Sequence, residues 1–187
     1  MSEPVTVTPH TLSDDELKDI GRLVRAFAEI EDIVAVHLCQ VGSLNEGQLA
    51  VLVGRLGISQ RVKMAEQFAK GLGGAAWEAH KACFKSGALK TLVDCRNAVA
   101  HGYLLGLTKE GTLAFRTASM SDVDPEFVTL KVVTYAPASI RRNGEEAVKL
   151  VAQLDQILRT SKRRKEHLSQ SLRPRSTPTQ GTGTQAK

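Results

Sequence analysis

Apolar side chains recur at helical spacing along most of the chain. In the first stretch they stand three or four positions apart between residues 17 and 38, at Leu17, Ile20, Val24, Phe27, Val34 and Leu38, with Ile30 and Ile33 widening the stripe. Ser13 and Glu16 precede the stretch at the spacing of a capping box, in which each side chain bonds the other residue's backbone amide. This pattern predicts a helix from about residue 14 to 40.

The same period continues in five further segments, which glycines or strand-like residues separate. It predicts helices at about residues 49–56, 59–72, 75–85, 88–101 and 137–158. Gly71, Gly73 and Gly74 lack the Gly-Lys-Ser/Thr ending of a phosphate-binding loop, so we interpret this cluster as the end of a helix.

The period changes after Gly102. Residues 103–107, 112–117 and 128–134 are rich in Leu, Val, Thr and aromatic residues, and residues 109–111 form a turn signal between the first two runs. We therefore expect a small antiparallel hairpin or three-stranded meander at about 103–134, inserted before the last helix. The fold class predicted from the pattern is mainly α.

Composition divides the chain into three parts. Residues 1–12 are expected to be a flexible N-terminus, residues 13–161 a helical domain, and residues 162–187 a disordered tail, because the tail is dominated by Ser, Thr, Pro, Gly, Gln and basic residues. The tail holds seven Lys or Arg and one acid, a net charge of +6, so the remaining 161 residues carry 18 basic and 19 acidic side chains, or −1. The basic tail could bind phosphate backbones nonspecifically, or it could simply keep the protein in solution.

Several classes of protein are not indicated. No apolar run approaches the roughly 20 residues of a membrane span, and residues 1–10 lack the basic and apolar regions of a secretory signal. The three cysteines, Cys39, Cys83 and Cys95, form no C-x-x-C pair. We expect free thiols in a reducing cytoplasm, no metal site and no cofactor.

The most unusual residue is Arg96, which falls among Leu89, Leu92, Val93, Val99 and Ala100 on the helical wheel. A guanidinium is always charged, so burying it requires an anionic partner. Candidates are Glu29, Glu31 or Asp32 of the first helix, a second subunit, or a phosphate. Asn97 and His101 lie four residues apart on a neighbouring face, and Gly102 is expected to end the helix in the left-handed conformation.

The run Arg96-Asn97-x-x-x-His101-Gly102 resembles the R-x4-H signature of the HEPN superfamily (higher eukaryotes and prokaryotes nucleotide-binding). With Tyr103 it is similar to the R-x4-H-x-Y variant of HEPN toxins that are paired with nucleotidyltransferase antitoxins. The resemblance implies an antiparallel helical bundle over about residues 13–160. It also implies a toxin-type or phage-defence ribonuclease with a composite site between two copies, and Tyr103 as a target for nucleotide transfer by the antitoxin.

The residue types suit metal-independent RNA cleavage. That reaction needs a base for the ribose 2′-hydroxyl, an acid for the leaving oxygen and positive charge at the phosphorane. His101 can take either proton role near neutrality, Arg96 matches phosphate oxygens, and Asn97 would orient the phosphate or the imidazole. On an ideal helix Arg96 and His101 point roughly 140° apart. We therefore expect a homodimer to bring the catalytic groups together on an RNA substrate.

Two other interpretations of these residues remain open. The chain could be a non-catalytic HEPN module that binds nucleotide, RNA or a protein partner with the same groups. Alternatively, Arg96 could be a structural arginine paired with a carboxylate of the first helix, with His101 capping its own helix. Tyr103 could equally pack at the start of the first strand.

Overall fold

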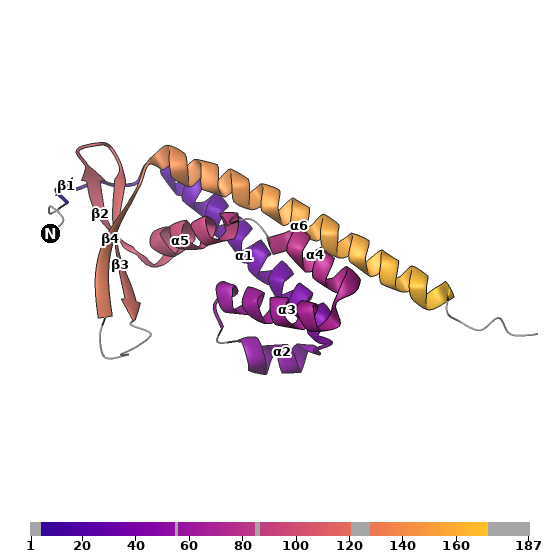
Figure 1. Cartoon of the computed structure of the whole chain (residues 1–187). Helices are drawn as coiled ribbons and strands as arrows, with labels where there is room; N and C mark the ends of the chain where they lie inside the picture. The colour runs from indigo at the N-terminus through magenta and orange to yellow at the C-terminus, as the bar shows by residue number, and fades with distance from the viewer. Residues whose placement is uncertain (1–4, 55, 85–86, 121–127, 172–187) are drawn as a thin grey trace, which may run out of the picture.

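The computed structural model describes residues 5–54, 56–84, 87–120 and 128–171, and in these residues six helices accompany one antiparallel sheet (Figure 1). The protein is mainly helical with a small antiparallel sheet, as the hydrophobic pattern predicts. The sheet lies at one end of the helical body, beside the first turns of the longest helices. Among the described helices, none is both long and apolar enough to cross a membrane.

Helix α1 (Asp14–Gly42) is the central helix and has the bounds expected from its pattern. Its capping box is present, because the Ser13 N–H donates to Glu16 Oε2 (2.7 Å) and the Glu16 N–H donates to Ser13 Oγ (3.3 Å). Its buried side chains recur every three or four residues, and those that are almost fully buried are Leu23, Phe27, Ile30, Val34 and Leu38. This face forms the main hydrophobic core with α5, α6 and the sheet.

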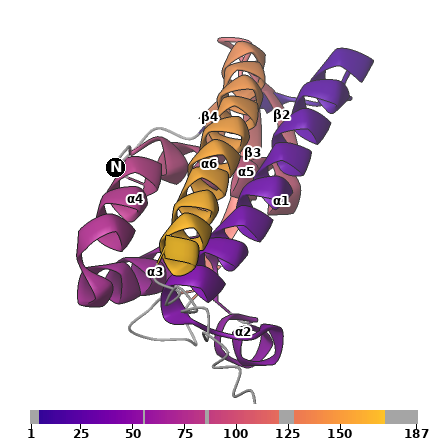
Figure 2. The same cartoon turned by 90° about the vertical axis from the view of Figure 1, so that its right-hand side faces the viewer.

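Helix α6 (Pro137–Ser171) lies alongside α1 (Figures 1 and 2). The two run in the same direction, since Arg141 near the start of α6 contacts Asp19 near the start of α1, whereas Asp155 lies across from Ile33. This pair therefore departs from an antiparallel bundle. The reason is the inserted sheet, which carries the chain back to the first turns of α1 before α6 begins.

Helix α6 also continues to Ser171, ten residues beyond the expected domain boundary. The sequence explains the extension, because residues 159–171 contain neither Gly nor Pro and many good helix formers. The last fully buried side chain described on α6 is Leu154. The rest of the predicted disordered tail, residues 172–187, lies outside the described residues.

Three shorter helices cover the C-terminal half of α1. They are α2 (Glu46–Val53), α3 (Ile58–Leu72) and α4 (Gly74–Phe84). A second apolar cluster joins them to α1 through Leu38 and Val41 on α1 and through Ala65 and Ala69 on α3. The predicted helix boundaries agree within a few residues; α3 begins at Ile58, one residue earlier than expected, with Gly57 as its N-cap.

The sheet has the strand order β1-β2-β3-β4, with every pair antiparallel. Strands β2 (Tyr103–Thr108), β3 (Leu113–Met120) and β4 (Val128–Tyr135) form the expected meander. Strand β1 (Val7–Thr8), within the N-terminus that was expected to be flexible, was not predicted. It can pair with β2 because Gly106 has φ 143° and no Cβ, which would collide there with the carbonyl oxygen of Thr8.

Two histidines are buried between α1 and α4. His37 Nε2 lies 3.2 Å from His80 Nδ1, and the rings of Trp77 and Phe84 pack against this pair. Burial lowers the pKa of His37 from 6.5 to about 4 and also lowers the pKa of His80. Both imidazoles are therefore neutral in the folded protein at pH 7.

This pair predicts acid-sensitive stability. The unfolded chain binds protons at these histidines below about pH 6.5 and the folded chain does not, so the free energy of unfolding falls as the pH drops. From pH 7 to pH 4, His37 alone accounts for about 3 kcal/mol of this loss. Urea unfolding at several pH values measures it.

The control is His37→Leu, which removes the titrating group from the same buried position. This variant is expected to show a shallower loss of unfolding free energy between pH 7 and pH 4 than the wild type. Parallel curves for the two proteins would contradict the assignment of the acid sensitivity to His37.

Candidate functional site

Helix α5 (Ala88–His101) carries the motif, and its buried face is turned slightly from the predicted one. Leu92, Cys95 and Ala98 are at most 2% exposed, whereas Ala100, which was expected in the apolar stripe, is exposed. Arg96 therefore lies at the edge of the buried face rather than in its middle, with 21% of its side chain exposed. This edge position lets the guanidinium touch both the core and the surface.

The guanidinium of Arg96 rests against α1. Its central carbon lies 5.0 Å from the ring centre of Phe27, and its Nη2 lies 3.5 Å from Glu31 Oε1. Phe27 and Glu31 are four residues apart and so share one face of α1. Of the three acids expected as partners, the structure selects Glu31.

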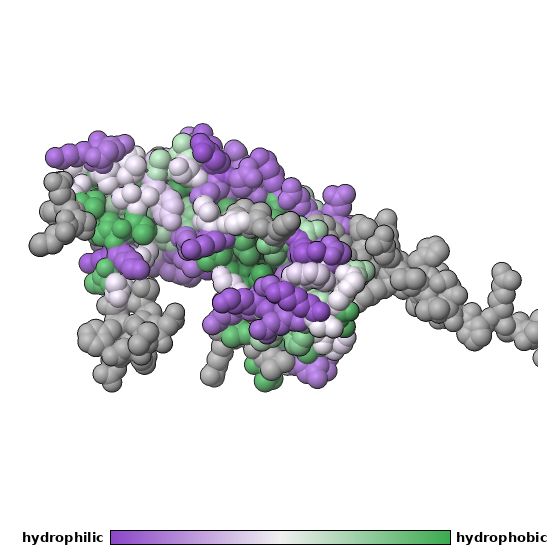
Figure 3. Space-filling model, in the orientation of Figure 1, coloured by the Kyte–Doolittle hydropathy of each residue, from purple (hydrophilic) through white to green (hydrophobic). Residues whose placement is uncertain are grey.

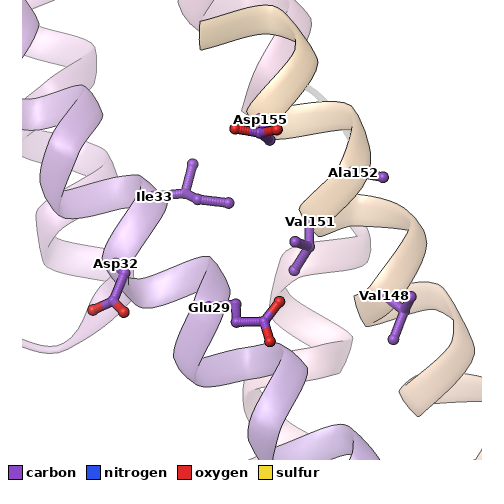
Figure 4. Close-up of a pocket in the computed structure, with 7 residues that line it drawn as sticks. All are labelled: Glu29, Asp32, Ile33, Val148, Val151, Ala152 and Asp155. Atoms are coloured by element: carbon purple, nitrogen blue, oxygen red, sulfur yellow. The ribbon is translucent and has the colours of Figure 1, made fainter. Parts of the chain in front are cut away.

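The other two candidate acids face a different part of the surface. Glu29 and Asp32 line a groove between α1 and α6, together with Asp155 and the apolar side chains of Ile33, Val148, Val151 and Ala152 (Figure 4). Arg25 and Arg159 pair with Glu29 and Asp155 there. These carboxylates are therefore separate from the Arg96 site.

The structure brings Arg96, Asn97 and His101 together within one chain. Arg96 Nη1 donates to Asn97 Oδ1 (3.0 Å) and lies 3.2 Å from His101 Nε2. The expectation that Arg96 and His101 diverge within one chain was wrong. It considered only the direction in which each side chain leaves the helix, whereas the long side chain of Arg96 reaches along the surface to the end of α5.

Arg96 also contacts the imidazole of His101. A guanidinium has only donors, so Arg96 Nη1 donates and His101 Nε2 accepts. Because His101 is exposed at the last residue of α5, a ligand from outside can reach the ring.

The pairing of Arg96 with the protein is incomplete. Its Nε is buried and has no hydrogen-bond partner among the described residues, and Glu31 meets only one nitrogen at a long 3.5 Å. A guanidinium held purely for structure normally has its buried donors satisfied, since each unsatisfied donor costs about 1–3 kcal/mol. Because Nε is enclosed, an anion can use this donor only when the guanidinium turns toward the surface.

Gly102 connects the motif helix to the sheet in an unexpected conformation. Its angles, φ −77° and ψ 152°, are extended rather than left-handed. Glycine is required here because a Cβ would collide with the carbonyl oxygen of Ala98 and lie 3.2 Å from Phe115 Cβ. The chain therefore passes from helix to strand in one residue, which places Tyr103 directly beyond His101.

Tyr103 does not pack into the core. It is 65% exposed, and the guanidinium of Arg116 on the neighbouring strand lies 5.3 Å from its ring centre. Cys95, next to Arg96, is fully buried, and burial raises the pKa of its thiol, so it is poorly suited to act as a nucleophile.

Sequence reasoning missed the part that Phe27 plays under the guanidinium. The available signal was the four-residue spacing of Phe27 and Glu31 on the first helix, whose acids were already candidate partners for Arg96.

Within the described residues, no group of three or more His, Cys, Asp or Glu side chains could hold a metal ion. Comparison with known proteins found no matching family model, no matching curated protein and no matching solved structure.

The incomplete pairing predicts that the site contributes little to stability. His101→Ala should change the free energy of unfolding by less than about 0.5 kcal/mol, because the ring is exposed. Arg96→Met should stay within about 1 kcal/mol of the wild type, because Met keeps the apolar contact with Phe27 and Glu31 remains accessible to water. Urea unfolding measures both variants.

Leu92→Ala provides the comparison, since removing this buried side chain should cost about 2–5 kcal/mol. A loss of about 3–5 kcal/mol in Arg96→Met, the usual cost of breaking a buried ion pair, would identify Arg96 as a structural arginine instead.

Proposed function

We propose that this protein is a metal-independent endoribonuclease of toxin–antitoxin or phage-defence type, with a HEPN-like helical body. The observation that carries the proposal is the Arg96–Asn97–His101 cluster, whose guanidinium is incompletely paired and whose imidazole is exposed. Support comes also from the resemblance of the motif to R-x4-H and from its place at the end of a helix in a mainly helical protein.

The proposed reaction is attack by the neighbouring ribose hydroxyl. When the phosphate draws Arg96 Nη1 away from His101 Nε2, this nitrogen takes the proton of the 2′-hydroxyl. The 2′-oxygen forms a bond to phosphorus, and the bond from phosphorus to the 5′-oxygen breaks. The leaving 5′-oxygen receives a proton from a second acid, and the product is a 2′,3′-cyclic phosphate. Arg96 stabilises the negative charge that builds up on the phosphate oxygens, and Asn97 positions the guanidinium.

A second copy of the chain would supply the second acid. Among the described residues, His101 is the imidazole that contacts Arg96, and the reaction requires two proton transfers. In the proposed homodimer the two His101 side chains face one phosphodiester: the unprotonated imidazole of one copy acts as base, and the imidazolium of the other copy acts as acid. Glu31 is then a positioning residue, which holds the guanidinium until a phosphate competes for it.

A second candidate function is binding of RNA or nucleotide without cleavage. The ion pair between Arg96 and Glu31 favours it, because a carboxylate that already occupies the guanidinium leaves less charge for a transition state. In this case the same residues would hold a phosphate in the ground state only. RNA cleavage and RNA binding by the Arg96 and His101 variants separate the two functions.

The motif resemblance extends the proposal to regulation in the cytoplasm. A nucleotidyltransferase antitoxin would transfer the nucleotide of a nucleoside triphosphate to the hydroxyl of Tyr103, with release of pyrophosphate and the phenolic proton. Tyr103 is exposed and follows His101 by two residues. The added group would stand at the entrance to the Arg96–His101 site and block RNA. Mass spectrometry of the protein co-expressed with the neighbouring gene product would detect the modified peptide.

The purified protein is expected to cleave single-stranded RNA in the presence of EDTA and to leave 2′,3′-cyclic phosphate ends. Arg96→Ala and His101→Ala should each lower the rate by about 10²–10⁴-fold, since each removes a transition-state group. Gel analysis with end-group determination measures the products. Arg142→Ala, which removes an exposed arginine of α6, is the control and should cleave normally.

Equal cleavage by the wild type and both site variants would overturn the catalytic assignment. RNA binding that depends on Arg96 without any cleavage would establish the second candidate function instead.

The composite site predicts interference between subunits. At saturating RNA, a tenfold excess of His101→Ala protein added to the wild type should lower cleavage about tenfold, because most wild-type subunits then pair with inactive ones. Sedimentation equilibrium should give twice the monomer mass. Unchanged cleavage in the mixture, or a monomeric mass, would contradict a site shared between copies.

A further inference from the structure

The outer face of the sheet carries an exposed row of side chains beside the proposed site. Tyr103 on β2, Arg116 on β3 and Val132 on β4 are cross-strand neighbours in one register row. The adjacent row of Leu104, Phe115 and Val133 packs against the helical core instead, so the first row faces away from the helices. We call Tyr103, Arg116 and Val132 the outer row.

The outer row combines an aromatic ring, a cation and aliphatic surface. Tyr103 is 65% exposed, Val132 is 44% exposed, and Leu130, two register pairs away on β4 and so on the same face, is 63% exposed. The guanidinium of Arg116 lies 5.3 Å from the ring centre of Tyr103. Figure 3 shows hydrophobic surface, coloured green, over the sheet.

The charge of the strands suits a phosphate-bearing ligand. Strands β2, β3 and β4 contain no acidic residue, and their charged residues are Arg116 and Lys131, both basic. The acids of the β3–β4 connection, residues 121–127, lie outside the described residues and are at least five strand positions from Arg116 along the sequence. Nothing on these strands therefore opposes an anion at Arg116.

The outer row begins close to His101, the proposed catalytic base. Tyr103 follows His101 by two residues through the extended Gly102, so their Cα atoms are at most about 7.6 Å apart. A phosphodiester held by Arg96 and His101 therefore has its neighbouring base within reach of the Tyr103 ring.

We propose that the outer row binds an unpaired base of single-stranded RNA, which stacks on Tyr103 while Arg116 contacts a phosphate. This inference rests on the proposed function, because it specifies the substrate class of the same site. A base in a duplex is already stacked and paired, so it cannot lie on the tyrosine. The site would then select single-stranded segments or loops, with little dependence on base identity, since every base has a stacking face.

The experiment uses a fluorescein-labelled 12-nucleotide oligouridine with 2′-O-methyl groups, which has no free 2′-hydroxyl and cannot be cleaved by the proposed reaction. Its binding to the full chain is measured by fluorescence anisotropy. Tyr103→Ala should weaken binding about tenfold or more, because stacking on an aromatic side chain contributes about 1–3 kcal/mol per base. Tyr103→Phe keeps the ring and should bind within about twofold of the wild type.

Two control binding measurements accompany the test. Leu72→Ala changes an equally exposed apolar residue on α3 and should not affect binding. A fully paired 2′-O-methyl duplex should bind the wild type and Tyr103→Ala alike. If Tyr103→Ala fails to fold, as judged by its circular dichroism melting curve, Arg116→Gln replaces it and should weaken oligouridine binding severalfold.

The inference is overturned if Tyr103→Ala binds the oligouridine like the wild type, or if Tyr103→Phe loses as much affinity as Tyr103→Ala, which would assign the role to the hydroxyl. A change of oligomeric state in Tyr103→Ala without a change in affinity would identify the outer row as a contact between copies instead. Tyr103-dependent binding without cleavage of ordinary RNA would leave the inference intact and refute the proposed catalysis. Normal cleavage with no Tyr103 dependence of binding would refute the inference alone.

Discussion

The contact between Arg96 and helix α1 organises the end of this protein that carries the candidate site. Its guanidinium lies over the ring of Phe27 and beside the carboxylate of Glu31, and from there it reaches the imidazole of His101. A permanently charged group is thus held at the edge of a hydrophobic core without a full set of partners. The guanidinium lies next to the exposed imidazole of His101, and an anionic ligand that draws it toward the surface would give its buried Nε–H a partner.

The inserted sheet and the site depend on each other through Gly102. The absence of a side chain at this residue lets α5 pass into β2 against Phe115, so the last helical residue and the first strand residue sit side by side. The same sheet returns the chain to the first turns of α1, which makes α6 run parallel to α1. The sheet therefore flanks the candidate site as well as connecting two helices.

The hydrophobic pattern predicted most elements, because their signals are local. The bounds of α1 follow from its capping box and its apolar spacing, and the meander follows from the change of period after Gly102. Strand β1 has no local sequence signal. Its two residues pair with β2 because Gly106, about a hundred residues away in the chain, permits the close approach. The direction of α6 relative to α1 likewise depends on how the sheet folds back.

The candidate site was predicted in its residues but not in its geometry. The motif supplied Arg96, Asn97 and His101, and charge balance named Glu31 among three possible partners. The helical wheel then separated Arg96 from His101, because it ignores the length of the arginine side chain. The exposure of Tyr103 and its contact with Arg116 required the strand register.

The most direct measurement of the central claim is a nuclear magnetic resonance titration of the ring nitrogens of His101 and the Nε–H of Arg96 with uridine 3′-monophosphate. In the free protein, the ring signals of His101 should report a hydrogen bond from Arg96 Nη1 to Nε2. As the nucleotide binds, the signals of His101 and Arg96 should shift together with one saturation curve, and Glu31→Gln should bind the nucleotide more tightly because the competing carboxylate is gone. Signals that stay unchanged at saturating nucleotide, with Arg96 still paired with Glu31, would contradict the account.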